Sequence, residues 1–205
     1  MSFSGNKLLI GTHNQGKVRE LQGMLGSLAL EVYSLAHFPQ IGEVDETGTT
    51  FAENARLKAV AYAAKSGLVT LADDSGLEVT ALHGRPGVQS ARYGGDNSEF
   101  SQKIAMLLDE IRAADDGREA RFVCSIAVAS PKGDLLAQVE GVCNGMIENE
   151  PRGGHGFGYD PVFVPNMSDR TFGEMSDEEK AQISHRANAF SQIIPFLRDF
   201  YGVST

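Results

Sequence analysis

The chain has 205 residues, of which 41% are hydrophobic and 22% charged, as expected for a globular protein with a sizeable core. Its net charge of −9 argues against the broad basic face that sequence-independent nucleic-acid binding requires. No apolar run approaches the roughly 20 residues that span a bilayer. We therefore expect no nucleic-acid or membrane partner.

The N-terminus lacks the apolar region and the cleavage site of a secretory signal. Two cysteines, Cys124 and Cys143, lie in apolar segments without metal-ligand spacing, and buried free thiols are the simplest account of them. Both observations predict a cytoplasmic protein.

The first third of the chain alternates apolar runs with helical patterns. Thr50 and Glu53 have the spacing of a capping box, which predicts a helix that ends at Gly67. Another helix is expected to begin near Gly16. Short buried strands are predicted at residues 7–11 and 68–72, an alternating strand at residues 30–35, and a loop at residues 36–48.

The remainder of the chain continues this mixed pattern. The Asp-Asp-Ser-Gly run at residues 73–76 is expected to separate the strand before it from a second extended piece. Ser176 and Glu179 form another capping box, and Pro195 predicts a kink in the terminal helix. The other expected elements are an extended piece at residues 77–82, a helix at 98–113, a hairpin that turns at 131–134 and a strand at 162–165. The fold class is therefore mixed α/β.

The stretch from Gly11 to Glu20, GTHNQGKVRE, has nearly the spacing of a phosphate-binding P-loop. Val18 stands where a P-loop needs a hydroxyl to help hold Mg²⁺, so a standard P-loop is disfavoured. A strand that enters a glycine-rich turn and then a helix still directs backbone amides and a positive dipole end toward an anion. A phosphate cradle and a bare structural turn both fit this stretch.

Asp73 and Asp74 end an apolar run, where a buried strand leaves the core. In a regular strand their side chains would point to opposite faces. Buried carboxylates need a cation or hydrogen bonds, and Mg²⁺ takes one or two carboxylates together with substrate phosphates. The alternative is an Asx-turn without chemistry.

Three further segments carry candidate site residues. The acidic run EVDETG at residues 43–48 is either solvated surface or a metal ligand. Lys58 lies among alanines, as a surface lysine or a phosphate ligand. The glycine-rich segment at residues 153–161 presents Phe157 and Tyr159, of which one could stack on a nucleobase or fill the local core.

A last group, Lys180 with His185 and Arg186, begins the terminal helix region. These residues are either ordinary helix-start residues or donors for a keto oxygen or a phosphate. Taken together, the segments supply a phosphate loop, an acidic metal site, an aromatic platform and a donor cluster. These are the parts needed to bind a metal-bound nucleoside triphosphate.

In this order the segments resemble the inosine/xanthosine triphosphate pyrophosphatases, which act on non-standard purine nucleotides. The resemblance runs from about Lys7 to Phe196 and rests on six blocks. These blocks are THNQGK, TFAENARLKA, ADDSGL, GRPGVQSARY, FGYDPVF and SHR. It implies an elongated α/β fold of two lobes around a long mixed sheet, with the active site in the cleft between the lobes. It also implies a single pyrophosphatase domain over residues 1–205 and a homodimer.

The resemblance implies a role for each matching residue. Asp74 corresponds to the catalytic acid and a metal ligand, and Asp45 to the second ligand of Mg²⁺, with Glu46 or a bridging water as the alternative to Asp45. The residues implied to bind substrate are Thr12, His13, Asn14, Gln15, Gly16, Lys17, Lys58, Ser75, Phe157, Gly158, Tyr159, Asp160, Lys180, His185 and Arg186.

The expected reaction is Mg²⁺-assisted hydrolysis of ITP, dITP or XTP to the nucleoside monophosphate and pyrophosphate. Asp74 is expected to position or deprotonate the water, with Asp73 as helper. Two alternatives stay open at this point: a nucleotide-binding module without hydrolysis, and a pyrophosphatase for another modified base.

Overall fold

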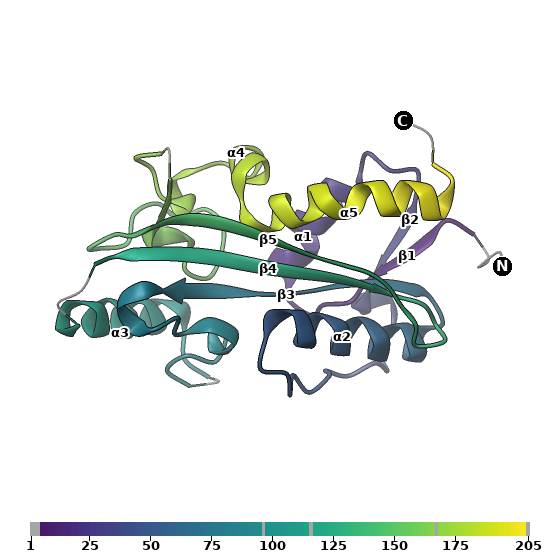
Figure 1. Cartoon of the computed structure of the whole chain (residues 1–205), viewed down its shortest axis with the longest axis horizontal. Helices are drawn as coiled ribbons and strands as arrows, with labels where there is room; N and C mark the ends of the chain where they lie inside the picture. The colour runs from purple at the N-terminus through teal and green to yellow at the C-terminus, as the bar shows by residue number, and fades with distance from the viewer. Residues whose placement is uncertain (1–4, 96, 115–116, 167, 204–205) are drawn as a thin grey trace. The chain divides into compact units, whose positions relative to one another are not determined.

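The computed structural model describes residues 5–95, 97–114, 117–166 and 168–203. Its strands form one mixed sheet in the order β2-β1-β3-β4-β5-β6, and with the helices they confirm the predicted α/β class (Figure 1). The strands are β1 (Lys7–Ile10), β2 (Glu31–Ser34), β3 (Val69–Val79), β4 (Glu119–Ala129), β5 (Leu135–Ile147) and β6 (Phe163–Pro165). The α-helices are α1 (Gln15–Leu25), α2 (Phe51–Ser66), α3 (Phe100–Ala113), α4 (Asp177–Ile183) and α5 (His185–Tyr201).

Within the described ranges, none of these helices has the length and hydropathy of a membrane-spanning segment. The chain divides into two compact units. Unit 1 holds residues 1–74, 124–141 and 187–205, and unit 2 holds residues 75–123 and 142–186. The boundary after Asp74 falls inside strand β3.

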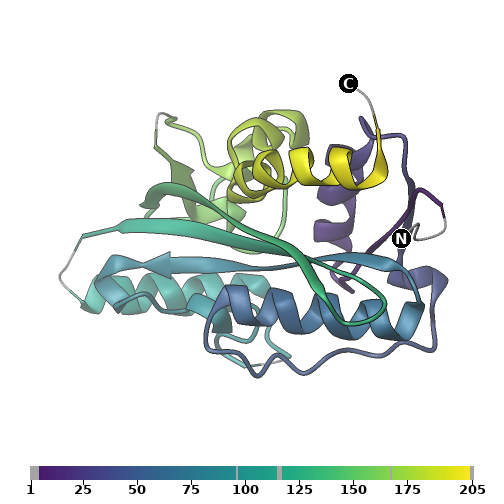
Figure 2. The ribbon, with the colours of Figure 1, turned by 45° about the vertical axis from the view of Figure 1, so that its right-hand side comes forward.

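In unit 1, strand β1 is buried on both faces of the sheet. Strand β1 pairs in parallel with β2 and with β3, and its continuous apolar sequence suits a central parallel strand. Leu8 and Ile10 pack with α1 and α5 on one face, whereas Leu9 packs with Tyr62 of α2 on the other. Figures 1 and 2 show α2 opposite α1 and α5 across these strands.

Helix α2 begins and ends as its sequence predicts. The Thr50 hydroxyl accepts from the Glu53 amide, and the Glu53 carboxylate accepts from the Thr50 amide, so the capping box is complete. At the other end Gly67 adopts a left-handed conformation with φ of 72°, which favours glycine. Alanines of α2 pack on Ala72, Ala127 and Ala129, and these small side chains let the helix lie close to the sheet.

Unit 2 has its own core. Helix α3 contributes four buried side chains, from Ile104 to Ile111, which join Leu77 and Val79 of β3. An aromatic cluster of Phe122, Phe163 and Phe172 belongs to the same core, with ring centroids of Phe122 and Phe163 4.7 Å apart. Strand β6 pairs antiparallel with β5, which closes this part of the sheet.

The expected break at residues 73–76 is wrong. Strand β3 runs through Asp73, Asp74, Ser75 and Gly76 as one extended element, so the Asx-turn interpretation is excluded. Tertiary pairing overrides the local turn preference of this sequence. The hairpin turn at residues 131–134, the capping box of Ser176 and the strand near 162–165 are confirmed, and Pro195 lies inside α5.

Both cysteines are free and buried, as predicted. Burial raises the pKa of the Cys143 thiol to about 11. We therefore expect Ellman's reagent at pH 8 to leave both thiols of the native protein unmodified over minutes, because about one Cys143 thiol in a thousand is ionised. Both should react at once in concentrated guanidinium, and rapid modification of either thiol in the native protein would contradict this burial.

Candidate active site

The turn between β1 and α1 holds the predicted phosphate loop. The Asn14 side-chain oxygen accepts from the amides of Gly16 and Lys17 at 2.9 and 3.1 Å, and so caps helix α1. The Thr12 hydroxyl accepts from the Asn14 amide at 3.2 Å. The amides of Gly16 and Lys17, which could otherwise bind a phosphate, thus donate their hydrogen bonds to Asn14. An anion at this turn would therefore contact the side chains first.

The turn also needs its first glycine. A Cβ atom at Gly11 would lie 2.8 Å from the Thr70 side chain and 3.0 Å from the Tyr62 ring, so a larger residue would push β1 away from its neighbours. His13 and Gln15 are exposed beside this turn, and with Thr12 they line a small cavity of about 240 Å³. The loop therefore presents polar side chains around an open space within unit 1.

Asp73 points toward the α1 face of the sheet. Its side chain is fully buried, and Oδ2 lies 3.2 Å from Lys17 Nζ. The thiol of Cys124 lies 3.8 Å from the same oxygen. Asp73 thus holds the Lys17 ammonium beside the end of the phosphate loop.

Asp74 points the other way, toward α2, as the alternation of a regular strand requires. Its Oδ1 accepts from Lys58 Nζ at 2.8 Å, and its Oδ2 accepts from Asn54 Nδ2 at 3.3 Å. The same Lys58 ammonium donates to Glu46 Oε1 at 2.7 Å. Two carboxylates from distant segments therefore meet at one cation.

Lys58 is only 7% exposed, so its interpretation as a surface lysine is wrong. Burial lowers the pKa of the Lys58 ammonium. The charges of Asp74, Asp73 and Glu46 raise it by more, and the net pKa lies above the ordinary value. Lys58 is therefore a protonated cation inside the protein.

For Asp74, burial and the neighbouring counter-charges each shift the pKa in the direction opposite to their effect on Lys58. Burial raises the pKa of Asp74, while the ammonium groups of Lys58 and Lys17 lower it, and the net direction is upward. A carboxylate with a raised pKa binds a proton more readily than an exposed aspartate does. This property suits a group that accepts a proton from water.

Two neighbouring acids of the run at residues 43–48, Asp45 and Glu46, have different environments. Glu46 makes the ion pair with Lys58, whereas Asp45, the residue implied to bind metal, is exposed. In the described part of the chain, no group of three or more His, Cys, Asp and Glu side chains is arranged to hold a metal ion. A site of two carboxylates completed by substrate phosphates is nonetheless common for Mg²⁺. Glu46 and Asp74, which already face one cation, fit such a site.

In unit 2, Asp160 organises the glycine-rich segment. Its buried Oδ2 accepts from the Phe157 amide at 2.7 Å and from Lys180 Nζ at 2.6 Å. A Cβ atom at Gly156 would lie 2.0 Å from this oxygen, so the turn requires glycine there. Asp160 therefore fixes both the Phe157 turn and the Lys180 ammonium.

Phe157 and Tyr159 have different environments. Tyr159 is buried, and its hydroxyl donates to the Ser90 carbonyl at 3.0 Å, so it anchors the segment to the loop of the GRPGVQSARY block. Phe157 is partly exposed, with Lys180 Nζ 4.7 Å and Arg186 Cζ 5.8 Å from its ring centroid. Phe157 is thus the aromatic that remains accessible to a ligand.

The donor cluster is held rigidly. Arg186 is only 1% exposed, and its Nη2 donates to Ser75 Oγ at 2.9 Å. His185 stacks on Phe122 with ring centroids 4.7 Å apart and an interplanar angle of 14°. The structure therefore brings Ser75, Phe157, Asp160, Lys180, His185 and Arg186 into unit 2, and Gly158, at φ of 66°, lies in the same turn.

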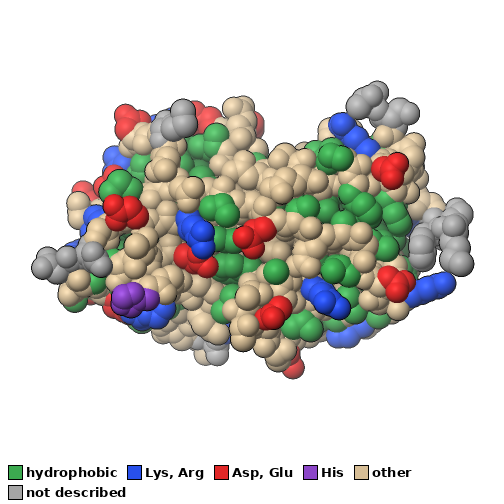
Figure 3. All heavy atoms as spheres, in the orientation of Figure 1, with side chains coloured by type: hydrophobic (Ala, Val, Ile, Leu, Met, Phe, Trp, Pro, Cys, Tyr) green, Lys and Arg blue, Asp and Glu red, His purple; other side chains and the backbone are tan. Residues whose placement is uncertain are grey.

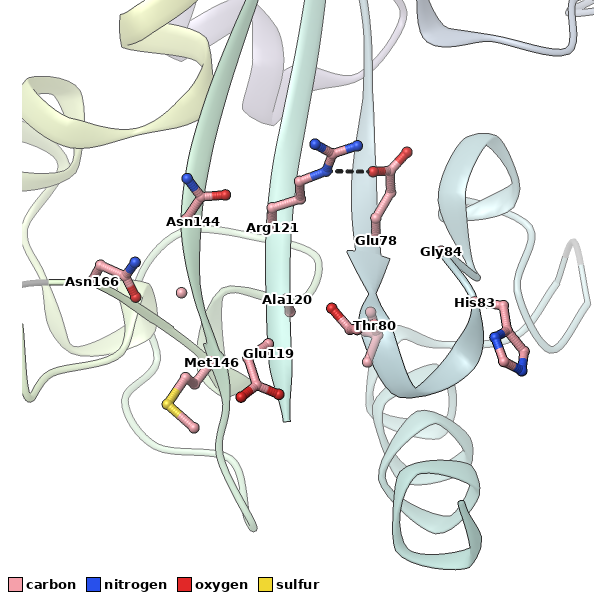
Figure 4. A pocket seen from close by; sticks show the side chains of 12 residues that line it. Glu78, Thr80, His83, Gly84, Glu119, Ala120, Arg121, Asn144, Met146 and Asn166 are labelled. Atoms are coloured by element: carbon pink, nitrogen blue, oxygen red, sulfur yellow. Dashed lines mark hydrogen bonds and ion pairs between the residues drawn. The ribbon is translucent and has the colours of Figure 1, made fainter. Parts of the chain in front are cut away.

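A larger open cavity of about 660 Å³ also lies in unit 2, over strands β3, β4 and β5. Figure 4 shows its polar lining, in which Glu78 and Arg121 form an ion pair at 2.7 Å and Asn144 and Asn166 lie nearby. The predicted site residues are not among the described residues that line it. Figure 3 shows acidic and basic side chains interspersed on the face that it draws.

The sequence analysis assigned no role to Asn54, which contacts Asp74, or to Ser90, whose carbonyl accepts from Tyr159. Asn54 directly follows Glu53 of the capping box, and this position was the available signal. Ser90 lies in the GRPGVQSARY block, but nothing in its local sequence indicates a partner 69 residues away.

Fold and site together define an α/β protein whose buried carboxylates and lysines suit a phosphorylated ligand. Residues 8–196 match the model of the Ham1 family. The chain therefore belongs to the Ham1 family.

Named relatives agree with this assignment. The chain is 48% identical to a dITP/XTP pyrophosphatase of an Exiguobacterium species over 94% of this chain and 99% of the relative. It is also 48% identical to the dITP/XTP pyrophosphatase of Geobacillus kaustophilus, over 91% and 92%. Among solved structures, a HAM1 protein from Coxiella burnetii superposes with a TM-score of 0.86 at 39% identity, over 94% of this chain and 98% of that protein.

The buried pair of Asp160 and Lys180 yields a stability prediction. Asp160→Asn should lower the free energy of unfolding by about 3–5 kcal/mol, because it leaves the Lys180 ammonium buried without a counter-charge. In the double variant Asp160→Asn, Lys180→Met the loss should be smaller than the sum of the two single losses. Urea unfolding of the four proteins measures this coupling, and additive losses would show that the pair is not coupled.

Proposed function

We propose that the protein hydrolyses non-standard purine nucleoside triphosphates, namely ITP, dITP and XTP, to the nucleoside monophosphate and pyrophosphate. The observation that carries this proposal is the meeting of Lys58, Asp74 and Glu46 in one buried cluster, beside the Asp73–Lys17 pair. Family membership and the activity for which its relatives are named support the same reaction.

The cluster in unit 1 would bind the triphosphate. Lys17 and Lys58 are the cations for the phosphoryl oxygens, and Asp73 positions Lys17. Three carboxylates, Glu46, Asp73 and Asp74, face two ammonium groups, so one negative charge remains for an added cation. Phosphate oxygens would take over part of the hydrogen bonding that Lys58 now gives to Glu46 and Asp74.

Mg²⁺ is the proposed cofactor. Asp74 would hold it together with Glu46, the inner acid, while the exposed Asp45 would contribute at most through water. Bound there, a divalent cation would neutralise charge on the phosphate oxygens and orient a water molecule.

Asp74 is the proposed catalytic residue. Its carboxylate would orient the attacking water and accept its proton as the anhydride between the α and β phosphates breaks. Asn54 and Lys58 hold its two oxygens in fixed directions.

Taken by itself, the cluster in unit 2 would bind a purine base. The accessible Phe157 ring would stack on the purine. His185, Lys180 and Arg186 would donate to the oxygen at C6, which hypoxanthine and xanthine carry where adenine has an amino group.

Three further expectations stay predictions: a single domain over residues 1–205, a homodimer and a cytoplasmic location. The order of preference among the three substrates is decided by competition assays. The assay that tests the function itself is pyrophosphate release from ITP in the presence of Mg²⁺. A nucleotide-binding module without hydrolysis would release none.

Asp74→Asn should reduce kcat for ITP by at least about 10³-fold, because the amide cannot accept the proton of the water. The substitution is nearly isosteric, so circular dichroism and the melting temperature should show a folded protein. Steady-state pyrophosphate release measures the loss. A folded variant that keeps most of its kcat would remove Asp74 from the mechanism.

Arg186→Ala should lose more activity on ITP than on ATP, because only the oxygen at C6 accepts a hydrogen bond from the guanidinium. The measurement is the ratio of kcat/KM values for the two nucleotides, compared with the same ratio in the wild type. Using the ratio removes any general loss from the cavity that the buried arginine leaves. Equal losses on both nucleotides would contradict a base-reading role.

A further inference from the structure

Asn54, in the first turn of α2, is 2% exposed and makes two hydrogen bonds across the site. Its Oδ1 accepts from the Gly48 amide at 2.8 Å, and its Nδ2 donates to Asp74 Oδ2 at 3.3 Å. One side chain therefore joins the acidic run at residues 43–48, called the acidic loop from here on, to the proposed catalytic carboxylate. All three residues lie within unit 1.

The chemistry of the partners fixes the orientation of this amide. The Gly48 amide can only donate, so it must face the oxygen of Asn54. An ionised Asp74 carboxylate can only accept, so it must face the nitrogen. Aspartate at position 54 would satisfy Gly48 but would place a carboxylate against Asp74, and leucine would satisfy neither partner.

The acidic loop is attached to α2 at three consecutive amides. The Asn54 side-chain oxygen accepts a hydrogen bond from the Gly48 amide. The Glu53 carboxylate accepts hydrogen bonds from the amides of Thr49 and Thr50 at 2.7 and 3.2 Å. The contact at Gly48 is close, because a Cβ atom there would lie 2.6 Å from Asn54 Oδ1. Glu46 stands only two residues before Gly48, so the position of its carboxylate depends on this attachment.

We propose that Asn54 is a positioning residue. It sets the direction of the Asp74 carboxylate and the place of Glu46, so that both carboxylates face the proposed Mg²⁺ site beside Lys58. This inference rests on the proposed function, since it assigns Asn54 to the metal and water site of that reaction. As a positioning residue, Asn54 would not contact substrate. It acts through Asp74 and through the loop that carries Glu46.

The test compares Asn54→Ala with Gln138→Ala as a matched control. Gln138 Nε2 donates to the Ala52 carbonyl at 2.7 Å, so it also ties the first turn of α2 to a neighbouring segment, but the described contacts of its side chain do not include Asp74 or the acidic loop. Each protein is assayed for kcat and KM with ITP. Mn²⁺ affinity of the nucleotide-free protein is measured by electron paramagnetic resonance, and hydrogen exchange is measured at the Gly48 amide.

In Asn54→Ala we expect kcat to fall and Mn²⁺ binding to weaken, each by about 10–100-fold, as for other residues that orient metal ligands. KM for ITP should change by less than about threefold, and the Gly48 amide should exchange faster. Gln138→Ala should keep wild-type kcat and Mn²⁺ affinity. Wild-type values in folded Asn54→Ala, or equal losses in both variants, would overturn the proposal, because a merely structural contact predicts those results.

If Asn54→Ala does not fold, Asn54→Asp decides the question. It keeps the acceptor for Gly48, so the amide should stay protected from exchange, while kcat should still fall at least about 10-fold because the donor to Asp74 is lost. Wild-type kcat in this variant would overturn the role. Failure of the proposed function is seen separately, as absence of pyrophosphate release by the wild-type protein, while the Mn²⁺ measurement reports on Asn54 without turnover.

Discussion

The two ion pairs of the protonated Lys58, with Glu46 and with Asp74, are the interactions on which the site depends. An ammonium that is only 7% exposed is stable only where carboxylates and hydrogen bonds replace its water. Those carboxylates come from the acidic loop and from the middle of β3, so the charge on Lys58 draws together segments that are distant in sequence. The same arrangement leaves two carboxylates facing one ammonium group.

Strand β3 distributes the chemistry between two helices. Because neighbouring residues of a strand face opposite ways, Asp73 meets Lys17 of α1 and Asp74 meets Lys58 of α2. Each lysine thus makes its ion pair with a different aspartate of β3. In unit 2 a separate buried pair, Asp160 with Lys180, holds the turn that presents Phe157. In both clusters a buried ion pair between an aspartate and a lysine fixes the position of the neighbouring site residues.

Features governed by local chemistry were predictable from the sequence. The capping boxes of Thr50 and Ser176, the end of α2 at Gly67 and the hairpin at residues 131–134 follow from patterns only a few residues long. Long-range contacts were not predictable in this way. The turn preference of residues 73–76 is overridden by pairing within the sheet, and the burial of Lys58 depends on Asp74, 16 residues away. Likewise, only the fold shows that Glu46 faces inward while Asp45 faces solvent, and that Asn54 joins the acidic loop to Asp74.

The alternation in β3 also restricts how the length of this chain can evolve. A residue inserted between Leu71, which pairs with Ile10, and Asp73 would reverse the faces of all residues after it. Asp73 would then take the place of Asp74 opposite Lys58, and Asp74 would face the α1 side one position further along, so Lys17 would lose its partner. The turn at residues 131–134 has no such restriction, since extra residues there would extend into solvent. Homologues should accordingly vary in length at that turn. They should show no insertions or deletions between Leu71 and Asp74.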